Sequence, residues 1–115
     1  MKEDNAVLPL KTLISLASDL EEAVSVASFH LEHQIKTTES KWEDTAIPEL
    51  CNYYSCLFTL RKLLLAELTT ISPEQAAQGQ VEMPVHEVQI MSALLQESEI
   101  MKDGLRKYGI SMVVH

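Results

Sequence analysis

Glycine, cysteine and basic residues are scarce in this chain of 115 residues, and each shortage excludes a class of protein. Three glycines are too few for the glycine-rich loop that cradles phosphate groups. The two cysteines, Cys51 and Cys56, stand five positions apart on a predicted helix, where their side chains diverge too far to form a disulfide. Nine lysines and arginines stand against 17 acidic residues, and the formal charge of -8 argues against a surface for nucleic acid or anionic membranes.

Long apolar segments are also missing. No apolar run reaches the roughly 18 residues that span a bilayer, and the N-terminus lacks the apolar core of a signal peptide. Without a disulfide framework or an export signal we expect a cytoplasmic protein, in a host cell if the chain comes from a phage or pathogen. The apolar share of 46% with 23% charged residues is typical of a globular protein. The length predicts one domain, 1–115, that buries a core without needing a metal or disulfides.

Residues 48–70 are predicted to form the central helix of an all-α, antiparallel three-helix bundle. Their apolar side chains recur at steps of three and four on two neighbouring stripes, which leaves only a narrow polar strip. A helix that is apolar around most of its circumference has to be covered on more than one side. Pro48 marks the start, although one kinked helix that begins earlier is an alternative. The first stripe consists of Leu50, Tyr54, Leu57, Arg61, Leu64 and Leu68, and the second of Tyr53, Cys56, Leu60 and Leu63.

The two flanking helices are predicted over 9–36 and 84–108. Apolar residues of the first follow a regular three-four rhythm for three heptads after Pro9, which suits the first turn of a helix. The second is expected to open at Met83-Pro84, and roughly a dozen residues join it to the central helix, so these two should lie antiparallel.

Short segments complete the predicted fold. Helical turns are expected over 41–46, with Trp42 as a buried anchor, and over 73–78. Residues up to about Ala6 are polar and are expected to be frayed. The apolar tail, 110–115, has the β-branched character of a short strand and is expected to dock on the bundle.

Arg61 is the charged residue on the apolar stripes of the central helix. A guanidinium that keeps its proton is costly to bury unpaired. Setting Arg61 level with Ser98 of the last helix pairs apolar residues in the other layers, such as Leu68 with Met91, and brings Glu21 of the first helix near the same buried polar layer. Three interpretations stay open. In the first, Arg61 pairs with Glu21, Glu22 or a backbone carbonyl and fixes the register of the helices. In the second its side chain extends to the rim of the bundle, and in the third it binds an anion or a partner protein.

His30 and His33 lie three residues apart near the end of the first helix, a spacing that can offer two nitrogens to one metal ion. No matching ligands stand out on another helix, so we predict no metal and no other cofactor. The two histidines are interpreted as surface residues that the helix dipole favours. Cys51 and Cys56 are expected to pack in the core.

A stripe on the first helix predicts a surface for self-association or for a partner: Glu22, Val26, Phe29 and His33. Two apolar residues on a nominally solvent-facing side suggest a second contact surface, although scattered surface residues are an alternative. Together with the regular seams and the apolar tail, this stripe favours a homodimer in which the first helix pairs with its copy.

The expected function is that of a small acidic protein-interaction module, an adaptor, regulator or inhibitor of another protein that acts by binding without catalysis. A partner with a basic surface is expected, since the chain is acidic. One alternative is an acidic mimic that blocks a nucleic-acid-binding protein. Another is a metal- or small-ligand-binding enzyme that uses His30, His33 and Arg61. The acidic residues that would form the mimic are Asp19, Glu21, Glu22, Glu32, Glu97 and Glu99.

Overall fold

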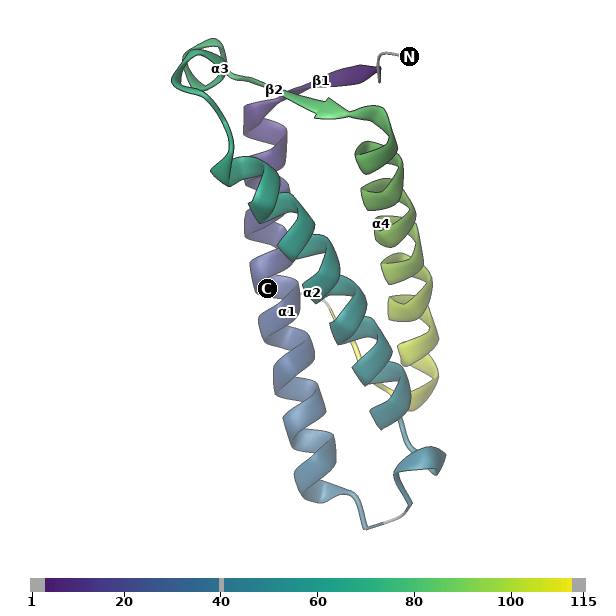
Figure 1. Ribbon diagram of the computed structural model, residues 1–115. Helices are drawn as coiled ribbons and strands as arrows, with labels where there is room; N and C mark the ends of the chain where they lie inside the picture. The colour runs from purple at the N-terminus through teal and green to yellow at the C-terminus, as the bar shows by residue number, and fades with distance from the viewer. Residues whose placement is uncertain (1–3, 40, 113–115) are drawn as a thin grey trace.

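Three long helices make up the bundle in the computed structural model, which describes residues 4–39 and 41–112. They are α1, Leu10–Thr37, α2, Ile47–Thr69, and α4, Val85–Leu105. α2 runs antiparallel to the other two and packs against both, so it is the middle helix (Figure 1). The all-α antiparallel three-helix bundle predicted from the sequence is confirmed, with a small two-stranded sheet added at one end.

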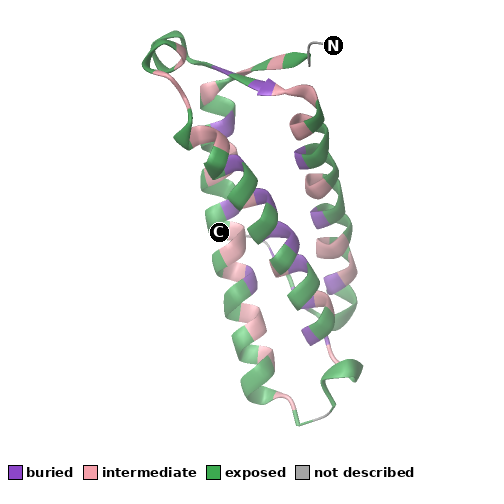
Figure 2. Ribbon diagram, viewed as in Figure 1, coloured by how far each residue is buried: buried purple, intermediate pink, exposed green. Residues whose placement is uncertain are grey.

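The burial of α2 explains its central place. Seven of its residues are buried, against three in α1 and three in α4, because α2 has a helix on each of two sides. α1 and α4 bury one stripe each and expose the opposite side to solvent (Figure 2). Burying a large apolar side chain contributes about 1.5–3 kcal/mol, so α2 supplies the largest part of the core. Its buried residues are Ile47, Leu50, Tyr53, Cys56, Leu57, Leu60 and Leu64.

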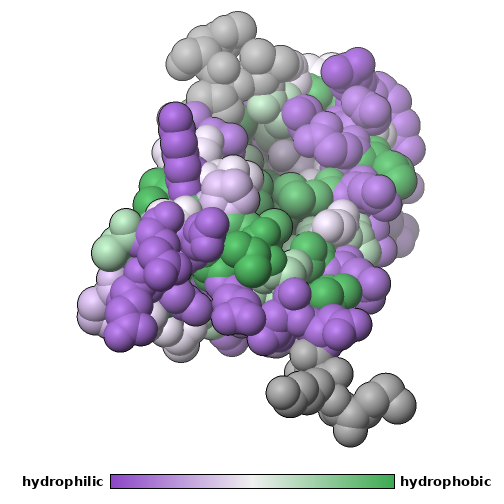
Figure 3. Space-filling view, turned by 90° about the horizontal axis from the view of Figure 1, so that it is seen from above, coloured by the Kyte–Doolittle hydropathy of each residue, from purple (hydrophilic) through white to green (hydrophobic). Residues whose placement is uncertain are grey.

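A two-stranded antiparallel sheet joins the starts of α1 and α4, and the sequence pattern did not reveal it. β1, Asn5–Pro9, pairs with β2, Gln80–Pro84. Val81 and Met83 of β2 are buried, and Val81 pairs with Leu8. The expectation of a frayed segment is therefore wrong for residues 5 and 6, because their backbone groups find hydrogen-bonding partners on a distant segment. Seen from this end, apolar side chains gather in the middle and polar ones surround them (Figure 3).

The sheet also moves the start of the last helix. Met83 belongs to β2, and Pro84 has an extended ψ of 137°, similar to the ψ of 128° at Pro9 before α1, so α4 begins only at Val85. The expected opening of this helix at Met83-Pro84 is wrong by one or two residues. The proline ends the strand because it has no N–H to donate to the ladder.

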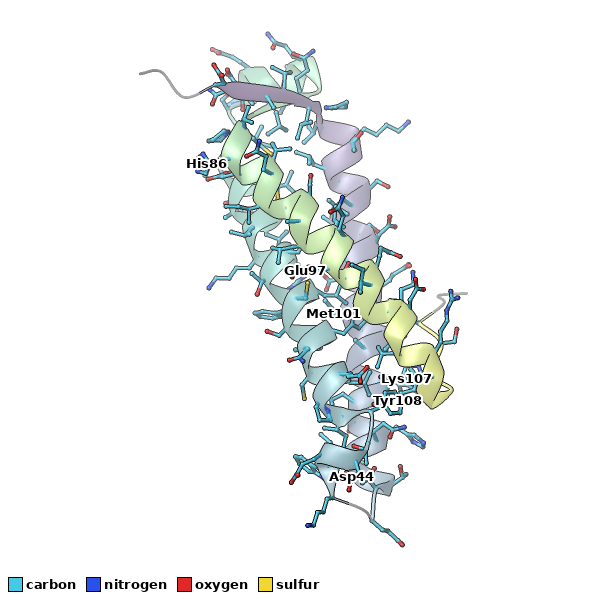
Figure 4. All side chains as sticks on the ribbon, turned by 90° about the vertical axis from the view of Figure 1, so that its right-hand side faces the viewer. Asp44, His86, Glu97, Met101, Lys107 and Tyr108 are labelled. Carbon is cyan, nitrogen blue, oxygen red and sulfur yellow. The ribbon has the colours of Figure 1, made fainter. Side chains whose placement is uncertain are left out.

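Two short helical segments connect the main elements. η1, a 3-10 helix over Trp42–Asp44, replaces the predicted turn over 41–46, and Trp42 is 53% exposed rather than a buried anchor. Trp42 is exposed because η1 lies at the far tip of the bundle, beyond the end of the core, where Asp44 is labelled in Figure 4. α3, Pro73–Gln78, forms as the sequence predicts: its Ser72 cap accepts a hydrogen bond from the Gln75 backbone N–H at 3.2 Å.

After α4 the chain forms a 3-10 turn, η2, over Arg106–Tyr108 and then reverses at Gly109. Gly109 has a φ of +75°, a conformation that glycine adopts without strain. The first residues of the tail, 110–112, form neither helix nor strand, so the predicted strand is absent from them, and 113–115 lie outside the described residues. Ile110 and Met112 are buried in the core cluster.

Candidate functional site

A groove lies between α1 and α4, and α2 forms its floor. Its volume is about 500 Å³. Leu20 of α1 and Tyr53 and Leu57 of α2 are buried residues that form its base, which is therefore mainly apolar, and Met112 of the tail is a further buried residue that lines it. The side chains at its rim are charged: Asp19, Glu22, Glu99 and Lys102. We call this cavity the α1–α4 groove.

The groove exists because α1 and α4 pack mainly against α2 and not against each other. In Figure 1 α1 and α4 stand on either side of α2, and the chain that follows α4, drawn in yellow, runs between them. Small side chains widen the space further, since Ala23 of α1 and Ser98 of α4 stand on its two walls. The three helices therefore leave an unfilled position at which another apolar segment can contact both α1 and α4.

The rim of the groove is strongly acidic. Asp19, Glu22 and Glu99 are exposed, and the ammonium of Lys102 lies 3.5 Å from a carboxylate oxygen of Glu99. Three negative charges against one paired positive charge give the rim a net negative charge. The phenol of Tyr53 lies below this rim, and burial together with the negative charge of Glu99 raises its pKa.

The polar groups of the groove include the hydroxyl of Ser98, a buried residue. The Ser98 hydroxyl donates to the Leu95 carbonyl of its own helix at 2.7 Å and is not directed at a base. Among the described residues that line the groove there is neither a histidine nor a cysteine, the usual bases and nucleophiles of enzymes. What the groove offers is an apolar base with carboxylates above it.

Arg61 lies on a different surface. Its Nε donates to the Glu21 carboxylate at 2.8 Å, which joins α2 to α1. This is the partner to which the sequence pointed, but the polar layer is not buried, because the Arg61 side chain is 29% exposed and that of Glu21 is 66% exposed. Ser98 is buried, yet it lines the α1–α4 groove and does not belong to this layer. The side chain of Arg61 thus pairs with Glu21 while reaching the surface.

The predicted register between α2 and α4 is also wrong. Ser98 lines the groove together with Tyr53 and Leu57, and the Cys56 thiol donates to the Leu94 carbonyl at 3.3 Å. Ser98 is therefore about two helical turns from the level of Arg61 at which the sequence placed it. Two turns are close to one heptad, and a heptad pattern repeats its apolar positions after such a shift, so several registers bury the same seams.

The stripe predicted for self-association changes character along its length. Glu22 belongs to the rim of the groove, and Val26 is half-buried and packs against the core, so Val26 does not lie on a free outer face. Phe29 is 66% exposed, and its ring stacks on that of His33 with 6.4 Å between centroids. His30 meets the edge of the same ring at 5.6 Å. The exposed part of the stripe is an aromatic cluster near the end of α1.

The three residues proposed for an enzyme do not converge. Arg61 pairs with Glu21, and His30 stands nine residues further along α1, about 13 Å at 1.5 Å per residue. Among residues 4–39 and 41–112, no group of three histidine, cysteine or acidic side chains is placed to hold a metal ion.

The acidic residues are divided among several surfaces. Asp19, Glu22 and Glu99 come together at the groove rim, whereas Glu21 pairs with Arg61 and Glu32 pairs with Lys36 at 2.9 Å. The Lys36 partner lowers the pKa of Glu32. Three of the six residues predicted for an acidic surface therefore line the groove, and two others form ion pairs outside its lining.

A pair of facing carboxyl groups lies where the end of α2 meets the start of α4. Glu67 and Glu87 line a small cavity of about 110 Å³ beside Leu63, Ile90 and Met91. The hydrogen bond to Glu87, burial, and the negative charge of Glu87 raise the pKa of Glu67 from 4.5 to about 7. Sequence reasoning missed this pair, because only the correct register brings the two helices together at these residues.

A second polar cluster ties the other end of α4 to α2. The Tyr108 hydroxyl donates to Glu49 Oε1 at 2.9 Å, and the Lys107 ammonium lies 3.1 Å from the same oxygen. Both residues stand at the lower end of α4 in Figure 4. Hydrogen bonds from Tyr108 and Lys107 lower the pKa of Glu49, and the same hydrogen bonds, together with the negative charge of Glu49, raise the pKa of both partners.

No family model matches the chain, and no curated protein or solved structure is significantly similar to it. Within the described residues, no helix is both long and apolar enough to pass through a membrane.

Proposed function

We propose that this chain is a small acidic protein-interaction module whose α1–α4 groove holds an apolar, basic-flanked helical segment of another protein. It acts by binding and not by turnover. The observation that carries the proposal is the groove itself, an apolar base between two helices with Asp19, Glu22 and Glu99 along its rim. A segment with lysines or arginines beside its apolar residues would complement both parts.

A helix is the segment that suits this geometry. α1 and α4 run in the same direction and stand on either side of the groove, so a helix laid between them would complete a four-helix arrangement with α2 (Figure 1). Amphipathic helices bind other proteins in this way, with apolar residues three and four apart in a hydrophobic groove. The carboxylates at the rim would then steer and orient the segment, and the apolar base would supply most of the affinity.

The test uses a peptide of about 14 residues, four helical turns, with leucines on one face and lysines on the other. Its partner peptide has the same lysines with glutamine in place of leucine. We expect fluorescence polarisation to show binding of the leucine peptide only. Equal binding of both peptides would mean that charge alone attracts them and would overturn the groove proposal in favour of a general acidic surface, as in a nucleic-acid mimic.

A matched pair of variants locates the binding site. Ala23→Phe fills the groove, and we expect it to weaken binding by about tenfold or more, because one or two apolar side chains of the peptide lose their place. Ala93→Phe adds the same side chain to an exposed position on the opposite side of α4 and should bind like the wild type. Equal effects of the two substitutions would place the peptide elsewhere.

Homodimerisation through α1 is a second proposal, and the aromatic cluster supports it. Phe29 exposes 66% of its surface and carries two histidine rings against it, which is a large apolar side chain to leave in water. This cluster lies beyond the described lining of the groove, so the two proposals can be tested separately.

A further inference from the structure

We propose that the tail, residues 110–112, is an intramolecular competitor for the α1–α4 groove, and that a partner segment has to displace Met112 in order to bind. This inference rests on the proposed function and concerns the regulation of the same site.

The tail already occupies one end of the groove. Met112 is only 7% exposed and lines the cavity together with Leu20 and Tyr53. Figure 1 shows the chain leaving the end of α4 and passing between α4 and α1. Only Ser111 separates Ile110 from Met112, so the Cα atom of Met112 lies at most about 7 Å from that of Ile110 and close to the end of α4. The remaining cavity of about 500 Å³ lies beside it.

The attachment of the tail is of a kind that can be released without unfolding the bundle. Residues 110–112 belong to no helix or strand, so the hydrogen bonds of α4 do not depend on them. The turn before them is closed by the Gly109 N–H to the Arg106 carbonyl at 2.9 Å and by the Ile110 N–H to the Leu105 carbonyl at 3.4 Å, the second of which is long for a hydrogen bond. The side chain of Met112 is itself held by apolar contacts, because it belongs to the core cluster and lines the groove.

The chemistry of Met112 matches that of the proposed ligand. Its side chain is apolar, unbranched and flexible, so it fits an irregular cavity and gives way to a better-shaped occupant. It contributes one apolar side chain to a groove in which a helical segment would place several. If a partner binds only the molecules from which the tail has left the groove, its apparent dissociation constant is the intrinsic one divided by the fraction of molecules with an open groove.

The first experiment compares two full-length variants in the leucine–lysine peptide assay. Met112→Ser weakens the competitor, and we expect the dissociation constant of the peptide to fall by about tenfold. Met101→Ser is the control, because Met101 is a methionine that packs against the core but belongs to α4 and is not part of the described groove lining. We expect its dissociation constant to stay within about twofold of the wild type. An unchanged or higher dissociation constant for Met112→Ser would overturn the inference.

The second experiment uses the wild-type protein, so it does not depend on how a variant folds. Amide hydrogen exchange is measured with and without saturating peptide. We expect exchange at Ile110, whose N–H bonds to the Leu105 carbonyl, to become about tenfold faster when the peptide binds, while exchange in α4 does not accelerate. Slower exchange at Ile110 would mean that the tail forms part of the binding surface and would overturn the competitor role. If the wild type and Met112→Ser both fail to bind the peptide, the proposed function fails as well, whereas binding without displacement refutes only the role of the tail.

Discussion

Replacing Glu67 by glutamine should stabilise the protein at pH 8 and have little effect at pH 5. In the folded protein Glu67 shares a hydrogen bond with Glu87, and its pKa is raised from 4.5 to about 7. The folded state therefore keeps a proton that the unfolded state releases at lower pH. The resulting stabilisation is fully present below pH 4.5 and is lost as the pH rises through about 7. Glutamine resembles the protonated acid and can donate to Glu87 at every pH.

The size of the effect follows from the pKa. A change from 4.5 to about 7 corresponds to about 3 kcal/mol at about 1.4 kcal/mol per pH unit. Glu67 is only partly buried, and solvent screens the repulsion between the two carboxylates, so we expect about 1–2 kcal/mol. In a domain of this size that is about 4–8 °C in melting temperature.

The assay is a series of thermal melts of the wild type and of Glu67→Gln between about pH 5 and pH 8.5, followed by circular dichroism. The quantity of interest is the difference between the two melting temperatures, since the many other carboxylates cancel in it. Glu74→Gln, at an exposed position on α3, is the control and should give a difference that does not change with pH. A difference for Glu67→Gln that is the same at pH 5 and pH 8 would refute the reasoning.

Three further outcomes are expected. Leu60→Ala, at a fully buried position of α2, should lower the free energy of unfolding by about 2–5 kcal/mol in urea titrations. Leu63→Ala, at a position that is 38% exposed, should lower it by clearly less. Similar losses for the two variants would contradict the central place of α2. Arg61→Met removes a partly exposed ion pair with Glu21 and should cost about 0.5–1 kcal/mol at low salt and less at high salt, whereas a salt-independent loss above about 3 kcal/mol would indicate a buried pair. If α1 pairs with its copy, Phe29→Glu should reduce the mass in light scattering to the monomer's 12.9 kDa, and a dimer that persists would exclude this surface.

Helix type and helix position were accessible from the sequence because they depend on local spacing. The two apolar stripes around α2 follow directly from residues three and four apart, and they predict a helix covered on two sides whatever the partners are. The pairing of Arg61 with Glu21 was also within reach, since a charge on an apolar stripe needs a partner on a neighbouring helix. The Ser72 cap and Gly79 set the limits of α3 through residues that lie next to each other in the chain.

Register and long-range pairing were not accessible. The seams between α2 and α4 repeat after seven residues, so the sequence allowed Ser98 to be placed opposite Arg61, two turns from its actual level. The sheet was missed for a related reason, because a strand of five residues gains its stability only from a partner, and β2 lies far along the chain from β1. Trp42 was expected inside because it is aromatic, but its position beyond the end of the core leaves it in solvent.

The sequence by itself determined an acidic helical bundle with α2 at its centre. Composition sets the charge, and the spacing of apolar residues by three and four sets each helix and its buried face without reference to the rest of the chain. Only the tertiary structure decided where a groove forms. The α1–α4 groove depends on how far α1 stands from α4 and on where the tail comes to rest, and the carboxylates of Asp19, Glu22 and Glu99 become neighbours only across that space. Such distances are set by the packing of whole helices against one another, and no local pattern of residues encodes them.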